Sequence, residues 1–190
     1  FDAVMLVGPE AARFVLVSGR NDLRWRMEGD PVTMLLRHGV LVEDGDSHDQ
    51  LRRAMNPALH KQMLDSYVEA MWRGTDQVMS RWSNTTPVDM LVEMRRVALL
   101  VLLDTLFKVD FNPDLDRLWN AILKTLGYIS PGLWMFSSRI PRPGYADSLR
   151  QMDEYLYEMI RLRRAHLGEP TDLRGLLISD PAMTDNLIRD

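Results

Sequence analysis

Hydrophobic residues recur at three- and four-residue steps along most of this chain, which is the period of an amphipathic α-helix. The clearest run spans residues 64–82, where the apolar positions are Leu64, Tyr67, Val68, Met71, Val78, Met79 and Trp82. Residues 88–107 are apolar on almost every side, so we expect a helix that is buried on several faces. The pattern therefore predicts a mainly α fold.

Shorter elements are expected around these two helices. Proline near the start and Gly19 after the end predict a helix over residues 9–18. The same signals predict helices over residues 115–126, 145–167 and 172–178, and another that begins near Met183. The β-branched run Ala3 to Val7, stopped by Gly8-Pro9, predicts one short N-terminal strand.

Two connections are apolar but lack a regular period. Between Asn21 and Asp46, glycine and proline interrupt a segment that contains Trp25, Met34, Leu35 and Val40. Between Tyr128 and Gly144, several prolines alternate with apolar residues that include Leu133 and Trp134. Long connections of this kind are more often functional than idle.

Composition narrows the class of protein. The 190 residues are 46% hydrophobic and 26% charged, which suits one domain with a sizeable core. The formal net charge is -4 and basic residues are interspersed with acids, which argues against a nucleic-acid partner. The longest apolar run, Val97 to Leu103, is too short to cross a membrane, so we expect a soluble, cytoplasmic protein. The chain starts at Phe1 inside an apolar run, which leaves an upstream leader or anchor open.

The chain contains no cysteine. This excludes disulfides, thiolate metal sites and cysteine nucleophiles within these residues. His38, His60 and His166 do not have the spacing of a zinc site, so no metal ligand is expected among them. Neither a glycine-rich phosphate loop nor a nucleophile elbow is present.

The most informative stretch is LVEDGDSHDQLRRAMNPALH, residues 41–60. An Asp-Gly turn precedes Ser47, and Gln50 follows three residues later, which is the spacing of a capping box and predicts a helix start at Ser47. His48 and Arg52 would then share one face near that start. Cations there oppose the helix dipole, so an anion that binds both side chains would remove the conflict. The alternative is that nearby aspartates neutralise them on a solvated surface.

This stretch resembles the C-helix signature of the cytochrome P450 monooxygenases, with its Asp-Gly turn, an aromatic or histidine position, Arg-Arg and a proline break. VMLVGPEAARFVLVSGRND resembles the preceding strand and B helix, and TPVDMLVEMRRVALLVLLDTLF resembles the E-helix region. SDPAMTDNLIRD resembles the entry to the long oxygen-activating helix. The four stretches occur in the family's order, so the whole chain resembles the N-terminal part of that fold.

The resemblance implies roles for particular residues. His48 and Arg52 match the pair that binds the haem propionates, and Arg53 matches a basic residue that faces an acidic electron-transfer partner, with plain solvation as its alternative. The two apolar connections match regions that line the substrate pocket, and ordinary packing is their alternative; the pocket candidates are Trp25, Met34, Leu35, Val40, Leu133 and Trp134. The implied parent activity inserts one oxygen atom of O2 into a small organic substrate. It would use electrons from a ferredoxin- or flavoprotein-type donor.

The chain departs from the family at one point, because the family binds haem iron through a cysteine thiolate. We therefore expect residues 1–190 to form a single incomplete domain that lacks the C-terminal half and is inactive alone. Apolar faces exposed on such a piece would favour dimers. The alternative is a helical protein-interaction or ligand-binding module without redox chemistry.

Overall fold

The computed structural model describes residues 4–19, 21–129, 140–166, 168 and 172–190, and for residues 61–66 the backbone only. Helices make up the regular structure of these residues, which confirms the mainly α prediction. In chain order the elements are α1 (Pro9–Arg13), a π-helical turn η1 (Phe14–Ser18), α2 (Pro31–Leu36), α3 (Gly45–Met55), a 3-10 turn η2 (Asn56–Leu59), α4 (Lys61–Met79), α5 (Met90–Phe107), α6 (Leu115–Ile129), α7 (Tyr145–Ala165), α8 (Leu173–Ser179) and α9 (Asp185–Arg189).

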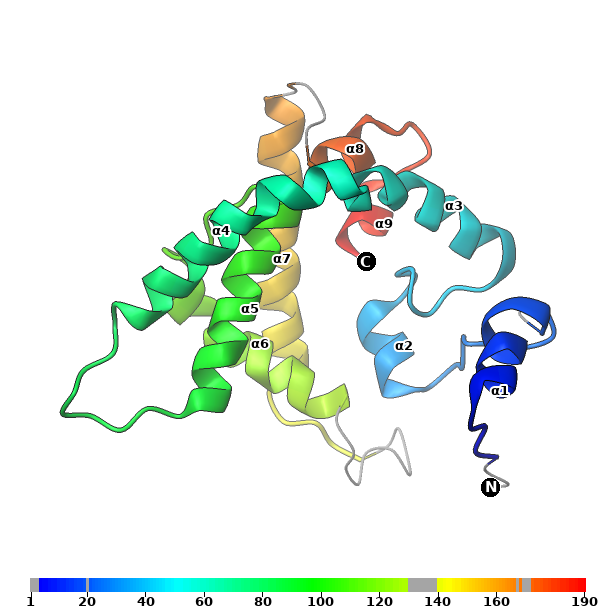
Figure 1. The fold of residues 1–190 in the computed structure, drawn as a ribbon, viewed down its shortest axis with the longest axis horizontal. Coiled ribbons are helices and arrows are strands. Elements are labelled where there is room, and N and C mark those ends of the chain that lie inside the picture. Colours follow the sequence, from blue (N-terminus) through cyan, green and yellow to red (C-terminus); the bar gives the residue numbers. More distant parts are fainter. Residues whose placement is uncertain (1–3, 20, 130–139, 167, 169–171) are drawn as a thin grey trace.

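Helices α4 to α7 form the larger group of packed helices, on one side of the molecule (Figure 1). Within it α4 packs on α5 and α6 packs on α7. Periodic apolar residues meet at the centre of this group, and the buried members of the cluster are Val78, Leu100, Phe111, Leu115, Leu118 and Trp119. Burial of such side chains contributes about 1.5 to 3 kcal/mol each, so this cluster is a main source of stability.

A second cluster fixes the position of α3. Leu51 of α3 and Ala58 of η2 pack with Leu173 and Leu177 of α8, and Met183 completes the group. Figure 1 shows α3 beside α8 and α9, with α2 and α1 below it. The side of α3 that carries Leu51 therefore packs on the second half of the chain. The adjacent side of α3 does not take part in this cluster and can bind a ligand.

The N-terminal strand prediction is wrong for residues 4–7, and Ala3 lies outside the described residues. Residues 4–7 have no strand assignment, and the side chains of Val4, Met5 and Val7 are exposed. A strand forms when its backbone N–H and C=O groups pair with a neighbouring strand. No described segment supplies that partner, so β-branched residues alone do not produce a strand here.

The connection from Asn21 to Asp46 contains a helix, α2, that the irregular pattern did not predict. Asp30 is its N-cap, and its carboxylate accepts hydrogen bonds from the N–H groups of Val32 and Thr33. Pro31 follows at the first helical position, where a backbone N–H would have no acceptor within the helix, so its absence in proline costs nothing. The local Asp-Pro signal was therefore present in the sequence, although the apolar period was too short to reveal it.

Two other helices differ from expectation. α6 continues through Gly127 to Ile129, so Tyr128 and Ile129, which were expected in an apolar loop, belong to this helix. An interior glycine costs a helix only about 1 kcal/mol, which does not force an end. α5 begins at Met90, after the N-cap Asp89. Leu91, Met94 and Leu102 are exposed, whereas the rest of its second half is buried or half-buried and contributes to both hydrophobic clusters.

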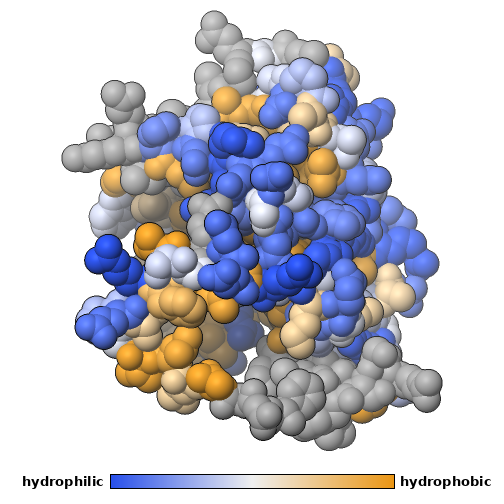
Figure 2. All heavy atoms as spheres, turned by 90° about the vertical axis from the view of Figure 1, so that its right-hand side faces the viewer, coloured by the Kyte–Doolittle hydropathy of each residue, from blue (hydrophilic) through white to orange (hydrophobic). Residues whose placement is uncertain are grey.

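None of the helices in the described part of the chain combines the length and the hydrophobicity that a membrane-spanning helix needs. The face that carries α1 and α2 shows hydrophobic residues gathered in its lower part, beside a broad polar region (Figure 2). Exposed apolar side chains of the N-terminal segment include Val4, Met5, Leu6, Val7, Phe14, Leu16 and Val17.

Candidate functional site

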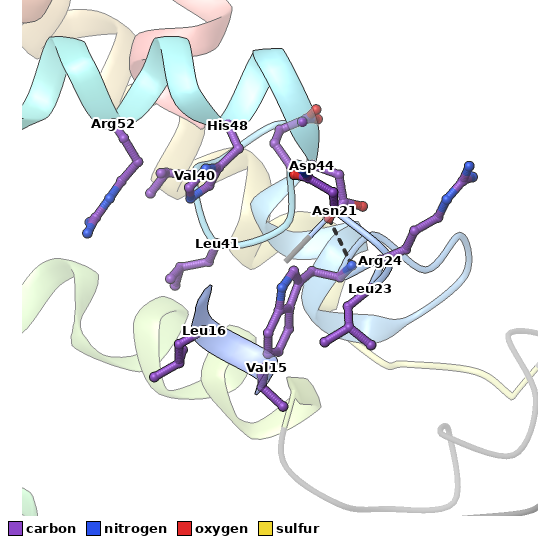
Figure 3. Close-up of a pocket in the computed structure, with 13 residues that line it drawn as sticks. Val15, Leu16, Asn21, Leu23, Arg24, Val40, Leu41, Asp44, His48 and Arg52 are labelled. Atoms are coloured by element: carbon purple, nitrogen blue, oxygen red, sulfur yellow. Dashed lines mark hydrogen bonds between the residues drawn. The ribbon is translucent and has the colours of Figure 1, made fainter. Parts of the chain in front are cut away.

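A cavity of about 810 Å³ lies under the first half of α3 (Figure 3). Its volume falls within the range of small-molecule and cofactor pockets, about 300 to 1,000 Å³. Besides α3, three segments line this open cavity: η1, the stretch before α2, and the connection from α2 into α3. The lining residues are Val15, Leu16, Asn21, Leu23, Arg24, Trp25, Val40, Leu41, Glu43, Asp44, Gly45, His48 and Arg52.

The start of α3 differs from the predicted capping box. The helix begins at Gly45, and the N-cap is Asp44 rather than Ser47. Gly45 has a φ of 60°, a value that side chains with a Cβ rarely adopt, so glycine suits the first position of this helix. Because the helix ends at Met55, Arg52 lies in its last turn, where the dipole favours a cation. The predicted conflict between the helix dipole and Arg52 is therefore absent.

The four-residue spacing of His48 and Arg52 nevertheless places both on one face of α3. Figure 3 shows both side chains on the side of α3 that faces the cavity, with His48 beside Val40 and Arg52 extending away from His48. The imidazole Nδ1 of His48 lies 3.1 Å from Oδ1 of Asp49. Arg52 forms no hydrogen bond or ion pair in the part of the chain that the structure describes. Arg52 is thus an exposed cation at the edge of a cavity whose lining includes both polar and apolar side chains.

The carboxylates that line the cavity are already bound by other groups. Asp44 accepts hydrogen bonds from the backbone N–H groups of Trp25 at 2.9 Å and Arg26 at 3.0 Å. The hydrogen bond from Trp25, together with that from Arg26, holds the pKa of Asp44 below its ordinary value. Glu43 contacts Arg26 at 3.0 Å and His38 at 2.7 Å. Both carboxylates therefore form their contacts with groups other than Arg52. Arg52 itself is exposed, and the alternative of neutralisation by aspartates on a solvated surface stays a prediction.

Apolar side chains form the rest of the wall. Val15 and Leu16 come from η1, and Leu41 lies between them and α3 in Figure 3. Leu23 lies on the same side of the cavity as Asp44 in that view. Trp25, another lining residue, donates its backbone N–H to the Asp44 carboxylate. The arrangement suits a ligand that is largely apolar and carries negative charge at one edge.

The structure brings together some of the predicted pocket residues. Trp25 and Val40 line the cavity, whereas Met34 and Leu35 lie on α2 and are not part of its lining. The Sδ atom of Met34 is instead 4.0 Å from Arg142. Leu133 and Trp134 lie outside the described residues. Their role as pocket residues, like that of Met34 and Leu35, stays a prediction.

Sequence reasoning missed the contribution of the first helical segment. Val15 and Leu16 line the cavity. The signal in the sequence was the run Val15-Leu16-Val17, because three consecutive apolar residues do not all lie on one face of a helix. Arg24 also belongs to the lining residues, although its side chain points away from the cavity in Figure 3. Arg53 is exposed and is not among the lining residues, as expected for a different face of α3.

Comparison with known proteins decides the family. The sequence model of the family described as Cytochrome P450 matches residues 2–185. The chain belongs to the cytochrome P450 family. The cytochrome P450 named 137 from Mycobacterium tuberculosis is 27% identical over 165 residues, which cover 80% of this chain and 35% of that protein. Abscisic acid 8'-hydroxylase 4 from Arabidopsis thaliana is 23% identical over 183 residues, which cover 94% of this chain and 38% of that protein.

A shorter match reaches a third curated relative. Cyclooctatin synthase from Streptomyces melanosporofaciens is 28% identical over 105 residues, 55% of this chain and 23% of that protein. The chain thus spans little more than a third of the length of the first two of these relatives. No solved structure matches the chain significantly.

The cavity of this cytochrome P450 chain fits the group that the family implies. Haem is a flat apolar ring system whose propionates carry two negative charges at one edge. The cavity offers apolar walls from η1 and from the connection into α3, with His48 and Arg52 at one side. No carboxylate among the described residues competes for Arg52. The residues present therefore suit haem at its propionate edge.

Proposed function

We propose that residues 1–190 form a single incomplete domain, the N-terminal part of a haem-thiolate monooxygenase, in which His48 and Arg52 bind the haem propionates. Bound haem would supply the oxygen-activating redox chemistry, while the protein contributes binding, orientation and electrostatics. The segment described here would contribute part of that binding.

One observation carries the proposal: two basic side chains four residues apart point into the same cavity, whose own carboxylates are engaged elsewhere. An arginine guanidinium binds a carboxylate through charge-assisted hydrogen bonds, which are about twice as strong as neutral ones. Histidine can add a further N–H donor beside it. A propionate edge would neutralise Arg52, which otherwise keeps its charge beside apolar residues.

The remaining parts of the activity need residues that this chain does not contain. It has no cysteine, so an axial thiolate must come from further sequence of the protein. We propose that the whole protein inserts one oxygen atom of O2 into a small organic substrate, with electrons from a ferredoxin- or flavoprotein-type donor, in the cytoplasm. The family match and the relatives named as hydroxylases support this reaction class. A polypeptide limited to these residues would be inactive.

The test is haem retention by the full-length protein. Arg52→Ala should lose haem at least about tenfold faster than the parent, because hydrogen bonds to charged groups contribute about 1.5 to 3 kcal/mol each. His48→Ala should have a similar or smaller effect. The measurement is haem content after dilution into an excess of a haem scavenger.

Arg53→Ala is the matched control, because it removes an exposed arginine from the same helix without touching the cavity. It should retain haem as well as the parent does. Retention by Arg52→Ala that equals the parent, or selective haem loss from Arg53→Ala, would contradict the proposed roles. A full-length protein that binds no haem at all would favour the helical interaction or ligand-binding alternative.

A further inference from the structure

Arg37 connects the segment in front of α3 to the second half of the chain. It follows α2 directly, and its guanidinium group donates two hydrogen bonds to the carboxylate of Asp153 on α7, at 3.0 and 2.6 Å. The two residues are 116 positions apart. Their side chains are only 24% and 22% exposed, so water screens this pair less than a surface ion pair. Hydrogen bonding to Asp153 raises the pKa of Arg37.

The end of α9 contributes to the same cluster. Asp190 Oδ1 lies 3.5 Å from Arg37, and Arg189 binds Asp190 at 2.6 Å while lying 3.9 Å from Asp153. We call these four residues, Arg37, Asp153, Arg189 and Asp190, the Arg37 cluster. A Cβ atom added at Gly39 would lie 2.6 Å from the backbone oxygen of Asp190, so glycine permits this close approach.

Polar contacts continue from the Arg37 cluster to the cavity wall. The backbone C=O of Arg37 accepts a hydrogen bond from Arg26 at 2.6 Å, and Arg26 also binds Glu43. The N–H of Val42 donates to the C=O of Gly39 at 2.9 Å, which closes the turn that carries Val40 and Leu41. The position of that wall therefore depends on where Arg37 is held.

The backbone of Arg37 supports this dependence. Its φ of 51° and ψ of -88° lie in a region that residues with a Cβ rarely adopt. Such conformations persist when surrounding contacts over-determine them, and they cluster where structure serves binding. The bidentate contact with Asp153 is the strongest contact of the Arg37 side chain, and it is long-range in sequence.

We propose that Arg37 is a positioning residue whose ion pair with Asp153 holds residues 38–44 in place as the wall of the His48–Arg52 cavity. Ligand retention in the cavity then depends on the contacts that Arg37, directly after α2, makes with Asp153 on α7 and with Asp190. This inference rests on the proposed function for the identity of the ligand, haem. The positioning of residues 38–44 does not depend on that identity.

The test uses hydrogen exchange on the full-length protein. Arg37→Gln and Asp153→Asn should each raise the exchange rate of amides in residues 38–44 about tenfold, as expected for loss of charge-assisted hydrogen bonds. The double variant should exchange more slowly than the sum of the two single effects predicts, because both single variants remove the Arg37–Asp153 pair. Arg37→Lys, which keeps the charge but loses the planar fork, should recover part of the protection.

Arg150→Gln is the control, since Arg150 forms an exposed ion pair with Asp147 on the same helix, with both side chains 66% exposed. It should leave exchange in residues 38–44 unchanged. Peptides from the core around Phe111 to Trp119 are the internal reference. Equal acceleration in that core, or parent-like exchange in residues 38–44 of Arg37→Gln, would overturn the positioning role.

Haem loss from the same variants links the cluster to the cavity. Arg37→Gln should release haem several-fold faster than the parent and more slowly than Arg52→Ala, because Arg37 does not line the cavity. Faster haem loss from Arg52→Ala with parent-like haem loss from Arg37→Gln would overturn this inference and leave the proposed function standing. A parent without haem would overturn the proposed function instead, and the exchange rates would still decide whether Arg37 holds residues 38–44.

Discussion

The carboxylate of Asp44 accepts a hydrogen bond from the backbone N–H of Trp25 at 2.9 Å, across 19 residues. Asp44 is the N-cap of α3, and Trp25 lines the same cavity as His48 and Arg52. The start of the helix and one wall of the cavity are therefore joined by a single side chain. Any change at Asp44 should loosen that wall before it affects the packed core.

Removal of the Asp44 acceptor should act locally. In Asp44→Ala the amides of Trp25 and Arg26 lose their acceptor, so their hydrogen exchange should accelerate by about tenfold. Asp46→Ala removes an exposed acid from the first turn of the same helix and serves as the control. Exchange measured residue by residue with NMR would show the difference. Equal protection in the two variants would contradict a role for Asp44 in holding the wall.

The hydrogen bonds to the Asp44 carboxylate should make the unfolding free energy depend on pH. The pKa of Asp44 is lowered in the folded protein, so its stabilising effect is fully present above the unfolded value of about 4 and is lost as pH falls through the folded value. We expect the difference in unfolding free energy between the parent and Asp44→Asn to be constant near neutral pH and to shrink below about pH 4. Urea unfolding at a series of pH values measures it. A difference that grew on acidification would show the opposite sign and refute the assignment.

Two leucines two residues apart on α5 test the burial pattern. Leu100 is 4% exposed in the central cluster, whereas Leu102 is 46% exposed. Leu100→Ala should destabilise the protein by about 2 to 5 kcal/mol through lost burial and the cavity left behind. Leu102→Ala should change stability by about 0.5 kcal/mol or less. Denaturant unfolding compares the two, and a large loss in Leu102→Ala would mean that further chain covers this face of α5.

A polypeptide limited to residues 1–190 should self-associate through exposed apolar faces. On α4, Trp72 is 68% exposed and lies next to exposed Val68 and Met71. Trp72 is the largest of these three exposed apolar side chains. Trp72→Glu should shift the polypeptide toward monomer, whereas Glu69→Gln, a change at a neighbouring exposed position, should not. Light scattering over a range of concentrations measures the association. A parent polypeptide that stays monomeric would show that these faces do not associate.

Local sequence patterns were sufficient for most of the helices and for the pairing of His48 with Arg52. A four-residue interval places two side chains on one helix face wherever the helix begins, so that prediction survived the shift of the start from Ser47 to Gly45. Likewise Asp89 and Asp172 act as N-caps through hydrogen bonds to residues two or three positions away. These interactions are complete within one turn, so the residues alone determine them.

Only the tertiary structure decided which residues from other segments contact the helices. Glu93 occurs in a helix that is otherwise nearly all apolar, and its burial depends on Trp82 and Arg96, which bind its two carboxylate oxygens. Asp44 became an N-cap without a side-chain capping bond because Trp25 and Arg26 occupy its carboxylate. Contacts between residues far apart in sequence form when several helices pack, and they outweigh local preferences of about 1 kcal/mol. The sequence therefore determined the helices and the shared face of His48 and Arg52, whereas packing determined the cavity and the strained turn at Arg37.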